Sequence, residues 1–242
     1  MNKADKFFTM TAVALAFLAA TGKAIAAAGT VDIYVNPTTW AFSHVGLPGD
    51  PCSYGNGTVN FANIQATGTI RGSSVTRYYF VGSFDVVNIR SATTCSPPLQ
   101  TLSGCNNMFY IQGTAAFPCS NGYNGTGNGT TGEITDATVF SNGDLYFFGP
   151  FSSAGGWPYS SNLSCYRFAE GWSGVNGFFC NGQVTQFTGD PADYSLVVSG
   201  FFTWVSGPLY SGGPIQTLNT PSGTARWHDY YKAFQDGWWT QP

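Results

Sequence analysis

Short segments in which apolar and polar residues alternate recur along this chain, and a period of two is typical of β-strands with one buried face. The clearest is Thr30–Val35, where Val31, Ile33 and Val35 share one face and Pro37 follows. The alternation therefore predicts a strand over residues 29–36. Further strand regions are predicted at 58–70, 76–89, 108–111 and 194–205.

Two Asn-Gly pairs stand between segments rich in β-forming residues. An Asn-Gly pair in this position favours a type I′ turn, because both residues tolerate a positive φ. The sequence therefore predicts two tight β-hairpins. Their turns are Asn142-Gly143, between 134–141 and 144–148, and Asn181-Gly182, between 178–180 and 183–185.

The C-terminal segment has a different spacing. Its aromatic residues recur at intervals that place them on one face of an α-helix, and Ser222 or Thr224 is positioned to cap the start. We therefore expect a short aromatic helix over 224–239 that closes one end of the domain, or docks on a neighbouring subunit or a ligand. The aromatic face consists of Trp227, Tyr230, Tyr231, Phe234 and Trp238.

Together these patterns predict an all-β fold. We expect one β-rich domain over residues 29–242, built as an antiparallel β-sandwich or jelly-roll-like domain with disulfides and the short C-terminal aromatic helix. The length suits a single domain of this kind.

Residues 1–28 have the three parts of a secretory signal peptide. Lys3 and Lys6 make a basic start, 7–22 is a short apolar run, and small residues at 24–28 suit cleavage. The run is shorter than the about 20 residues that a spanning helix needs. We therefore expect a secreted or cell-surface protein with no stable membrane span once this segment is removed. An uncleaved anchor is the alternative.

Charged side chains make up only 9% of the chain, against about 25% in ordinary globular proteins. Without residues 1–28, which hold three lysines and one aspartate, 6 basic side chains face 11 acidic ones, a net charge of −5. Nucleic-acid phosphates are bound by clustered Lys and Arg, so we expect no nucleic-acid partner. Aromatic residues reach 17%, and aromatic surfaces with little charge suit repeated protein contacts.

An even number of cysteines in an exported chain indicates disulfides. No C-x-x-C motif occurs, which argues against a zinc site, a thioredoxin-like site and covalently bound haem. Sequence alone leaves the connectivity open, and a Cys165–Cys180 bridge is preferred because the segment between them is short and rich in turn residues. The cysteines are Cys52, Cys95, Cys105, Cys119, Cys165 and Cys180.

Catalytic motifs are absent from the sequence. A Ser-His-Asp triad needs a histidine base, but the chain has only His44 and His228 and no G-x-S-x-G elbow. Glu133 and Glu170 lack the context of a glycosidase pair, and the acidic residues within 136–144 lack the spacing of an EF-hand. We therefore expect a protein that is not an enzyme and has no cofactor and no metal site.

Two sets of residues are candidates for carrying or contacting glycans. N-x-S/T sequons occur in loop-like contexts, where a glycan would be sterically acceptable. The sequons begin at Asn56, Asn124, Asn128 and Asn162. The first aromatic candidates for stacking on a sugar are Trp157, Tyr159, Trp172 and Trp204.

These observations favour an exported structural subunit of an extracellular or cell-surface assembly, such as a filament, pilus-like fibre, sheath or matrix. Its partner would be a second copy of itself. We expect 29–36 to act as a donor strand, with Val31, Ile33 and Val35 filling a groove on a neighbour. An ordinary first strand of the chain's own domain is the alternative. The alternative function is a secreted carbohydrate-binding module or lectin-like adhesin.

Overall fold

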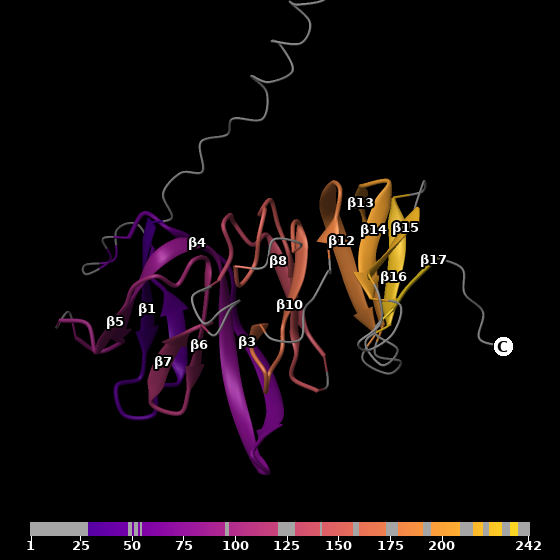
Figure 1. Ribbon diagram of the computed structural model, residues 1–242. Coiled ribbons are helices and arrows are strands. Elements are labelled where there is room, and N and C mark those ends of the chain that lie inside the picture. Colours follow the sequence, from indigo (N-terminus) through magenta and orange to yellow (C-terminus); the bar gives the residue numbers. More distant parts are fainter. Residues whose placement is uncertain are drawn as a thin grey trace, which may run out of the picture.

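A computed structural model shows a predominantly β protein with mixed and antiparallel sheets (Figure 1). The predicted signal peptide, 1–28, lies outside the described residues. In the described part of the chain there is no helix long and apolar enough to cross a membrane. The structure describes residues 29–47, 50, 53, 55–94, 97–120, 129–140, 142–156, 160–172, 179–190, 195–208, 215–219, 223–228 and 233–236.

The N-terminal sheet is organised around one long strand. Strand β4 spans nineteen residues and pairs with four other strands, and the main path through the sheet is β2-β1-β4-β6-β7, with β3 and β5 also on β4. The alternation in the sequence correctly predicted β1, β3, β4 and β6. The strands are β1 (Gly29–Val35), β2 (Phe42–Val45), β3 (Thr58–Ile70), β4 (Ser73–Ser91), β5 (Gln100–Leu102), β6 (Met108–Gln112) and β7 (Ala115–Pro118).

Strand β1 runs parallel to β4, which corrects the expectation of a wholly antiparallel fold. The register along β4 shows how its two halves are paired. β1 starts beside Phe84 in the middle of β4 and continues to its C-terminal end, whereas β3 covers the N-terminal half of β4 in the antiparallel sense. A register shift between Gly29 and Thr30 marks the place where the two halves of β4 change partner.

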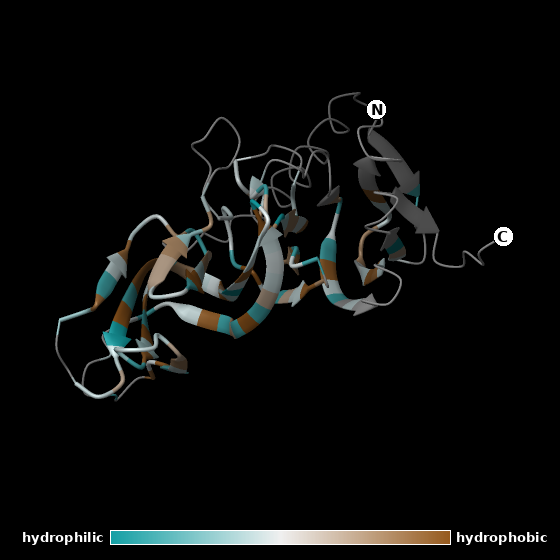
Figure 2. Ribbon diagram, turned by 90° about the horizontal axis from the view of Figure 1, so that it is seen from below, coloured by the Kyte–Doolittle hydropathy of each residue, from teal (hydrophilic) through white to brown (hydrophobic). Residues whose placement is uncertain are grey.

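Both halves of this sheet contribute to one apolar cluster. Val31 and Ile33 of β1 and Ile89 of β4 pack with Phe109 and Ala116 of β6 and β7. In Figure 2 apolar and polar bands alternate along the strands, as expected for a sheet with one face buried. The sheet therefore curves around its own core. Gln100 of β5 helps to close it, because its amide donates to the carbonyl of Ala116 (2.8 Å) and accepts from the amide of the same residue (2.9 Å).

The middle sheet has the order β10-β9-β8, with β8 at Asp136–Val139, β9 at Leu145–Phe148 and β10 at Leu163–Tyr166. The hairpin predicted at Asn142-Gly143 is confirmed, since β8 and β9 pair across it. The predicted type I′ turn is wrong, because only Gly143 of the two has a positive φ, 88°. Every residue of β9 and β10 is buried.

The two faces of the middle sheet belong to different cores. Leu145 and Phe147 pack with Tyr79 of the N-terminal sheet, whereas Tyr146 and Phe148 pack with residues of the C-terminal strands. The middle sheet is therefore a shared wall, and Figure 1 shows β8 and β10 between the two flanking groups of strands.

A buried arginine joins the N-terminal sheet to the segment after β10. The Arg77 guanidinium lies over the rings of Tyr110 and Phe168, 4.4 and 4.5 Å from their centroids. Its Nη1 donates to the Phe168 carbonyl (2.7 Å) and its Nε to Gln112 Oε1 (3.0 Å). The hydrogen bonds and the two rings thus satisfy a cation that would otherwise be costly to bury.

The C-terminal strands form two antiparallel sheets, of order β11-β14-β15 and β12-β13-β16-β17. The hairpin predicted at Asn181-Gly182 is wrong, because β11 pairs with β14 and β12 pairs with β13. The strands are β11 (Phe179–Cys180), β12 (Gln183–Asp190), β13 (Ser195–Phe201), β14 (Trp204–Pro208), β15 (Ile215–Asn219), β16 (Thr224–His228) and β17 (Ala233–Asp236).

The aromatic helix predicted over 224–239 is also wrong, because β16 and β17 are paired antiparallel strands. Trp227 and Phe234 are seven residues apart, which fits one helix face, but they are also direct partners in the β16–β17 register. The same spacing therefore satisfies both structures. Aromatic and β-branched residues favour the strand. The remaining residues of the predicted helix lie outside the described part.

Candidate assembly site

The predicted donor strand lies between two strands of its own chain. β1 pairs with β4 from Gly29 to Val35 and with β2 through Ile33↔Val45 and Tyr34↔His44. Val31, Ile33 and Val35 are at most 3% exposed and belong to the core of the N-terminal sheet. The structure thus places them as an ordinary first strand would be placed. Donation to a neighbour stays a prediction.

The other face of β1 carries a buried ion pair. The Asp32 side chain is fully buried, and its Oδ1 accepts from Arg90 Nε at 2.6 Å and from Asn88 Nδ2 at 3.2 Å. Ser53 Oγ donates to Oδ2 at 3.3 Å. Three donors therefore compensate for the desolvation of this carboxylate.

The sequence alone does not predict this pair. Asp32 is a charged residue within an otherwise apolar and uncharged strand, in a chain where only 9% of residues are charged. A charge in that place signals either an exposed face or a buried partner. Arg90 is 58 residues away along the chain, and only the parallel register of β1 on β4 brings the two together.

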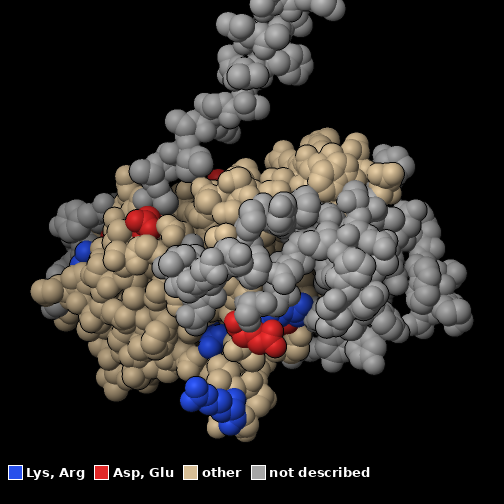
Figure 3. All heavy atoms as spheres, in the orientation of Figure 1, with Lys and Arg blue, Asp and Glu red and all other residues tan. Residues whose placement is uncertain are grey.

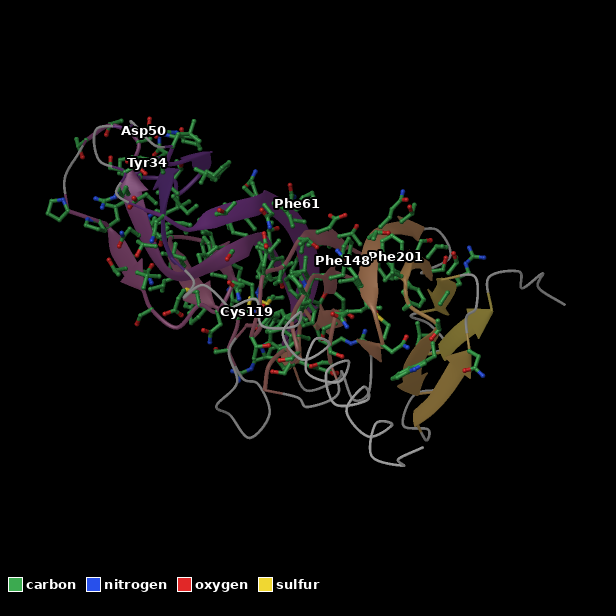
Figure 4. The ribbon with its side chains drawn as sticks, turned by 90° about the horizontal axis from the view of Figure 1, so that it is seen from above. Tyr34, Asp50, Phe61, Cys119, Phe148 and Phe201 are labelled. Carbon is green, nitrogen blue, oxygen red and sulfur yellow. The ribbon has the colours of Figure 1, made fainter. Side chains whose placement is uncertain are left out.

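Beside this pair, Tyr34 of β1 contributes to a small cluster with His44 and Asp50. The rings of Tyr34 and His44 stack in parallel, with centroids 4.5 Å apart and an interplanar angle of 3°. His44 Nε2 lies 3.8 Å from Asp50 Oδ2. Figure 4 shows Tyr34 and Asp50 at the same end of the molecule, far from Phe201. The cluster joins β1, β2 and the segment after β2.

The start of β1 is covered tightly by the segment before β3. The Thr30 amide donates to Asn56 Oδ1 (3.1 Å), and the Gly57 amide donates to the Thr30 carbonyl (2.9 Å). A Cβ at Gly55 would lie 2.2 Å from the Thr30 carbonyl oxygen. Glycine is therefore required at position 55 for this close approach.

The two described sequons differ in what their amide nitrogens do. Asn56 is exposed, and its side-chain oxygen carries the contact with Thr30. Asn162 has a φ of 64° and its Nδ2 donates to the Cys180 carbonyl at 3.1 Å. A glycan is attached through Nδ2, so in the folded chain Asn56 is the better acceptor. Asn124 and Asn128 lie outside the described residues.

Two of the aromatic residues predicted to stack on sugars, Trp172 and Trp204, lie in the described part of the chain. Trp172 is fully buried and its Nε1 donates to the Cys119 carbonyl (2.9 Å). The prediction for Trp172 is therefore wrong, because its ring packs in the core between Phe147 and Tyr166. Trp204 is partly exposed at the start of β14. The other two predicted residues, Trp157 and Tyr159, lie outside the described residues.

The four described cysteines, Cys105, Cys119, Cys165 and Cys180, are buried, and no disulfide joins them. Burial raises the pKa of the Cys105 and Cys180 thiols to about 12, and that of Cys119 well above its usual value. Cys165 and Cys180 share one apolar cluster. Cys52 and Cys95 lie outside the described residues.

Neither a metal site nor a related protein gives a further lead. Among the described residues there is no group of three or more His, Cys, Asp or Glu side chains that could hold a metal ion. Comparisons with protein families, with curated proteins and with solved structures found no match to this chain. Function is therefore inferred from the chain's own residues.

Proposed function

We propose that this chain is an exported structural subunit of an extracellular or cell-surface assembly, in which β1 of one copy occupies the β1 position of the next. The observation that carries the proposal is the place of β1. It is the first strand after the predicted signal peptide, it fills a position between two other strands, and it supplies Val31, Ile33 and Val35 to the core. An identical strand from a second copy would satisfy the same contacts.

The surface composition supports a role in repeated self-contact. Among the described residues on the face in Figure 3, charged side chains are sparse and most atoms belong to uncharged residues. Charge keeps soluble monomers apart, and its depletion together with exposed aromatic residues is typical of interface cores. The exposed rings include Phe117 at 40% and Phe201 at 81%.

Sandwich packing and disulfides belong to the same proposal. The N-terminal sheet, in which β1, β6 and β7 contribute to one shared core, supports a sandwich-like domain. The shared cluster of Cys165 and Cys180 supports a bridge between the middle sheet and the C-terminal strands, and we propose that all six cysteines are oxidised after export. Thiol labelling under denaturing, non-reducing conditions tests this, and two labelled thiols or more per chain would contradict it.

The assembly proposal is tested on the mature protein by size-exclusion chromatography with light scattering and by negative-stain microscopy. We expect long assemblies without added ligand. A single monomeric species at every concentration would contradict the proposal.

A matched pair of variants then tests the role of β1. Ile33→Asp buries a carboxylate without a partner, so assembly should be lost. Thr38→Asp adds the same charge on the exposed segment between β1 and β2 and should assemble normally. A peptide of residues 29–36 should shorten wild-type assemblies by competing for the position of β1. Normal assembly of Ile33→Asp would show that β1 is peripheral to the contact.

The second candidate function is a carbohydrate-binding module or lectin-like adhesin. It is favoured by the exposed Phe201 and the partly exposed Trp204, which flank the bend between β13 and β14. A soluble protein with saturable glycan binding, lost in Phe201→Ala and Trp204→Ala, would replace the assembly proposal.

A further inference from the structure

The polar face of β1 accepts only one alignment on β4. In the observed register Asp32 is opposite Asn88, and Arg90 is two residues further along the same face. A shift of β1 by one residue would turn Asp32 into the apolar core and move Ile33 to the polar face. A shift of two residues toward the start of β4 would place Asp32 opposite Val86 and leave Arg90 without its carboxylate.

The ion pair is buried deeply enough to enforce this alignment. The side chains of Asp32 and Arg90 are 0% and 11% exposed. A carboxylate held in such a site strongly disfavours any arrangement in which its partner is lost. If only its apolar residues mattered, many other strands with similar alternation could take the place of β1. Asp32 therefore distinguishes this strand from a generic one.

We propose that Asp32 and Arg90 form the selective contact between copies, so that Asp32 of one copy binds Arg90 of the next and fixes the register and direction of the exchanged strand. The inference rests on the proposed function. The partner is a second copy of this chain, because only a strand with an acidic residue at the central position, flanked by β-branched residues, matches this groove.

Charge exchange between copies tests the proposal. Chains carrying Asp32→Arg and chains carrying Arg90→Asp are each refolded alone, and then together in equal amounts. Alone, each variant places two like charges in the buried site, and assembly should be at least about 100-fold weaker than in the wild type. In the mixture every junction between unlike copies restores one acidic and one basic side chain. Assemblies should therefore return, with the two variants in equal proportion.

The double variant, with both substitutions in one chain, is the control for folding. It should fold and assemble by itself, because the pair is restored within and between its copies. Rescue by the double variant without rescue by mixing would overturn the inference, since the pair would then act only inside one chain. Long wild-type assemblies together with that outcome would leave the proposed function standing through another contact. A monomeric wild type would overturn both.

Discussion

Strands β1 and β9 are both buried on two faces, but they bury different kinds of side chain. β1 turns apolar residues to one face and Asp32 to the other, where Arg90 neutralises it. β9 turns Leu145 and Phe147 to one core and Tyr146 and Phe148 to another. A strand that is apolar on both faces gains more from burial, but its side chains do not specify the register. β9 therefore supplies stability, and β1 restricts its register through Asp32.

The register of β9 must therefore come from its surroundings. Asp144, directly before β9, accepts from the Phe168 amide at 2.7 Å and pairs with Arg167 at 2.5 Å. Asn142 in the preceding turn donates to the same carboxylate at 3.0 Å. The polar contacts that fix this strand lie at its end, whereas those of β1 lie at its centre.

The largest expected effect is the loss of an aromatic ring from β9. Phe147 is fully buried beside Phe151 and Trp172. Phe147→Ala should lower the free energy of unfolding by about 3–5 kcal/mol, from lost burial and the cavity left behind. Urea unfolding followed by tryptophan fluorescence measures it. Phe201→Ala, at a ring that is 81% exposed, is the control and should change stability by less than about 0.5 kcal/mol. An equal loss of stability in Phe147→Ala and Phe201→Ala would contradict the assignment of β9 to the core.

The next largest effect comes from substitutions that make β1 apolar on both faces, as β9 is. Arg90→Met leaves Asp32 buried without its cation and should cost about 2–3 kcal/mol, less than for a fully enclosed pair because water reaches Arg90. Adding Asp32→Leu should recover most of this loss, since apolar replacement of both partners is often close to neutral. We expect the double variant to unfold near wild-type denaturant concentrations. A double variant less stable than Arg90→Met alone would contradict the view that Arg90 compensates for the burial of Asp32.

A smaller effect is expected at the end of β9. Asp144→Asn keeps an acceptor for the Phe168 amide but removes the charge facing Arg167, and should cost about 1–2 kcal/mol. Asp50→Asn removes a carboxylate 3.8 Å from His44 at the surface and should cost less than about 0.5 kcal/mol. Thermal unfolding of the two variants side by side measures the difference. An equal loss in both would mean that Asp144 does not hold the register.

The smallest effect concerns the strand beside β9. Burial raises the pKa of Asp136 on β8, against a smaller lowering by its hydrogen bond to the Ala137 amide. The folded state therefore holds this proton more firmly than the unfolded state, and stability from this group is lost as pH rises through the raised pKa. Asp136→Asn should gain slightly over the wild type at pH 7, and the gain should vanish below about pH 3. Unfolding curves at both pH values decide it.

Sequence patterns revealed the strands whose two faces differ. β1, β3, β4 and β6 alternate because one side faces a core and the other faces solvent or polar partners. β9 carries four apolar residues in succession, and such a run does not reveal that two separate cores flank it. The Asn142-Gly143 turn placed the strand correctly, because the positive φ of Gly143 is a local property of glycine.

The pairing of strands that are distant in the sequence could not be predicted, for physical reasons. The parallel direction of β1 depends on where β4 lies, and no local signal records it. The C-terminal error has a similar origin. A seven-residue interval between Trp227 and Phe234 fits a helix face and a hairpin pair equally. The extended form of β16 is stabilised by its pairing with β13, which is distant in the sequence.

The parallel alignment of β1 and β4 also has a mechanical consequence. Gly29 begins β1 beside the middle of β4, and the paired register extends to Ser91. The ladder bonds lie across the strands, so a pull along β1 through the chain that follows Val35 loads them together in shear and does not peel them one after another. Rupture under force is governed by the rate of unfolding. A fibre whose junctions had this geometry would hold tension at each joint far longer than a joint opened from its end.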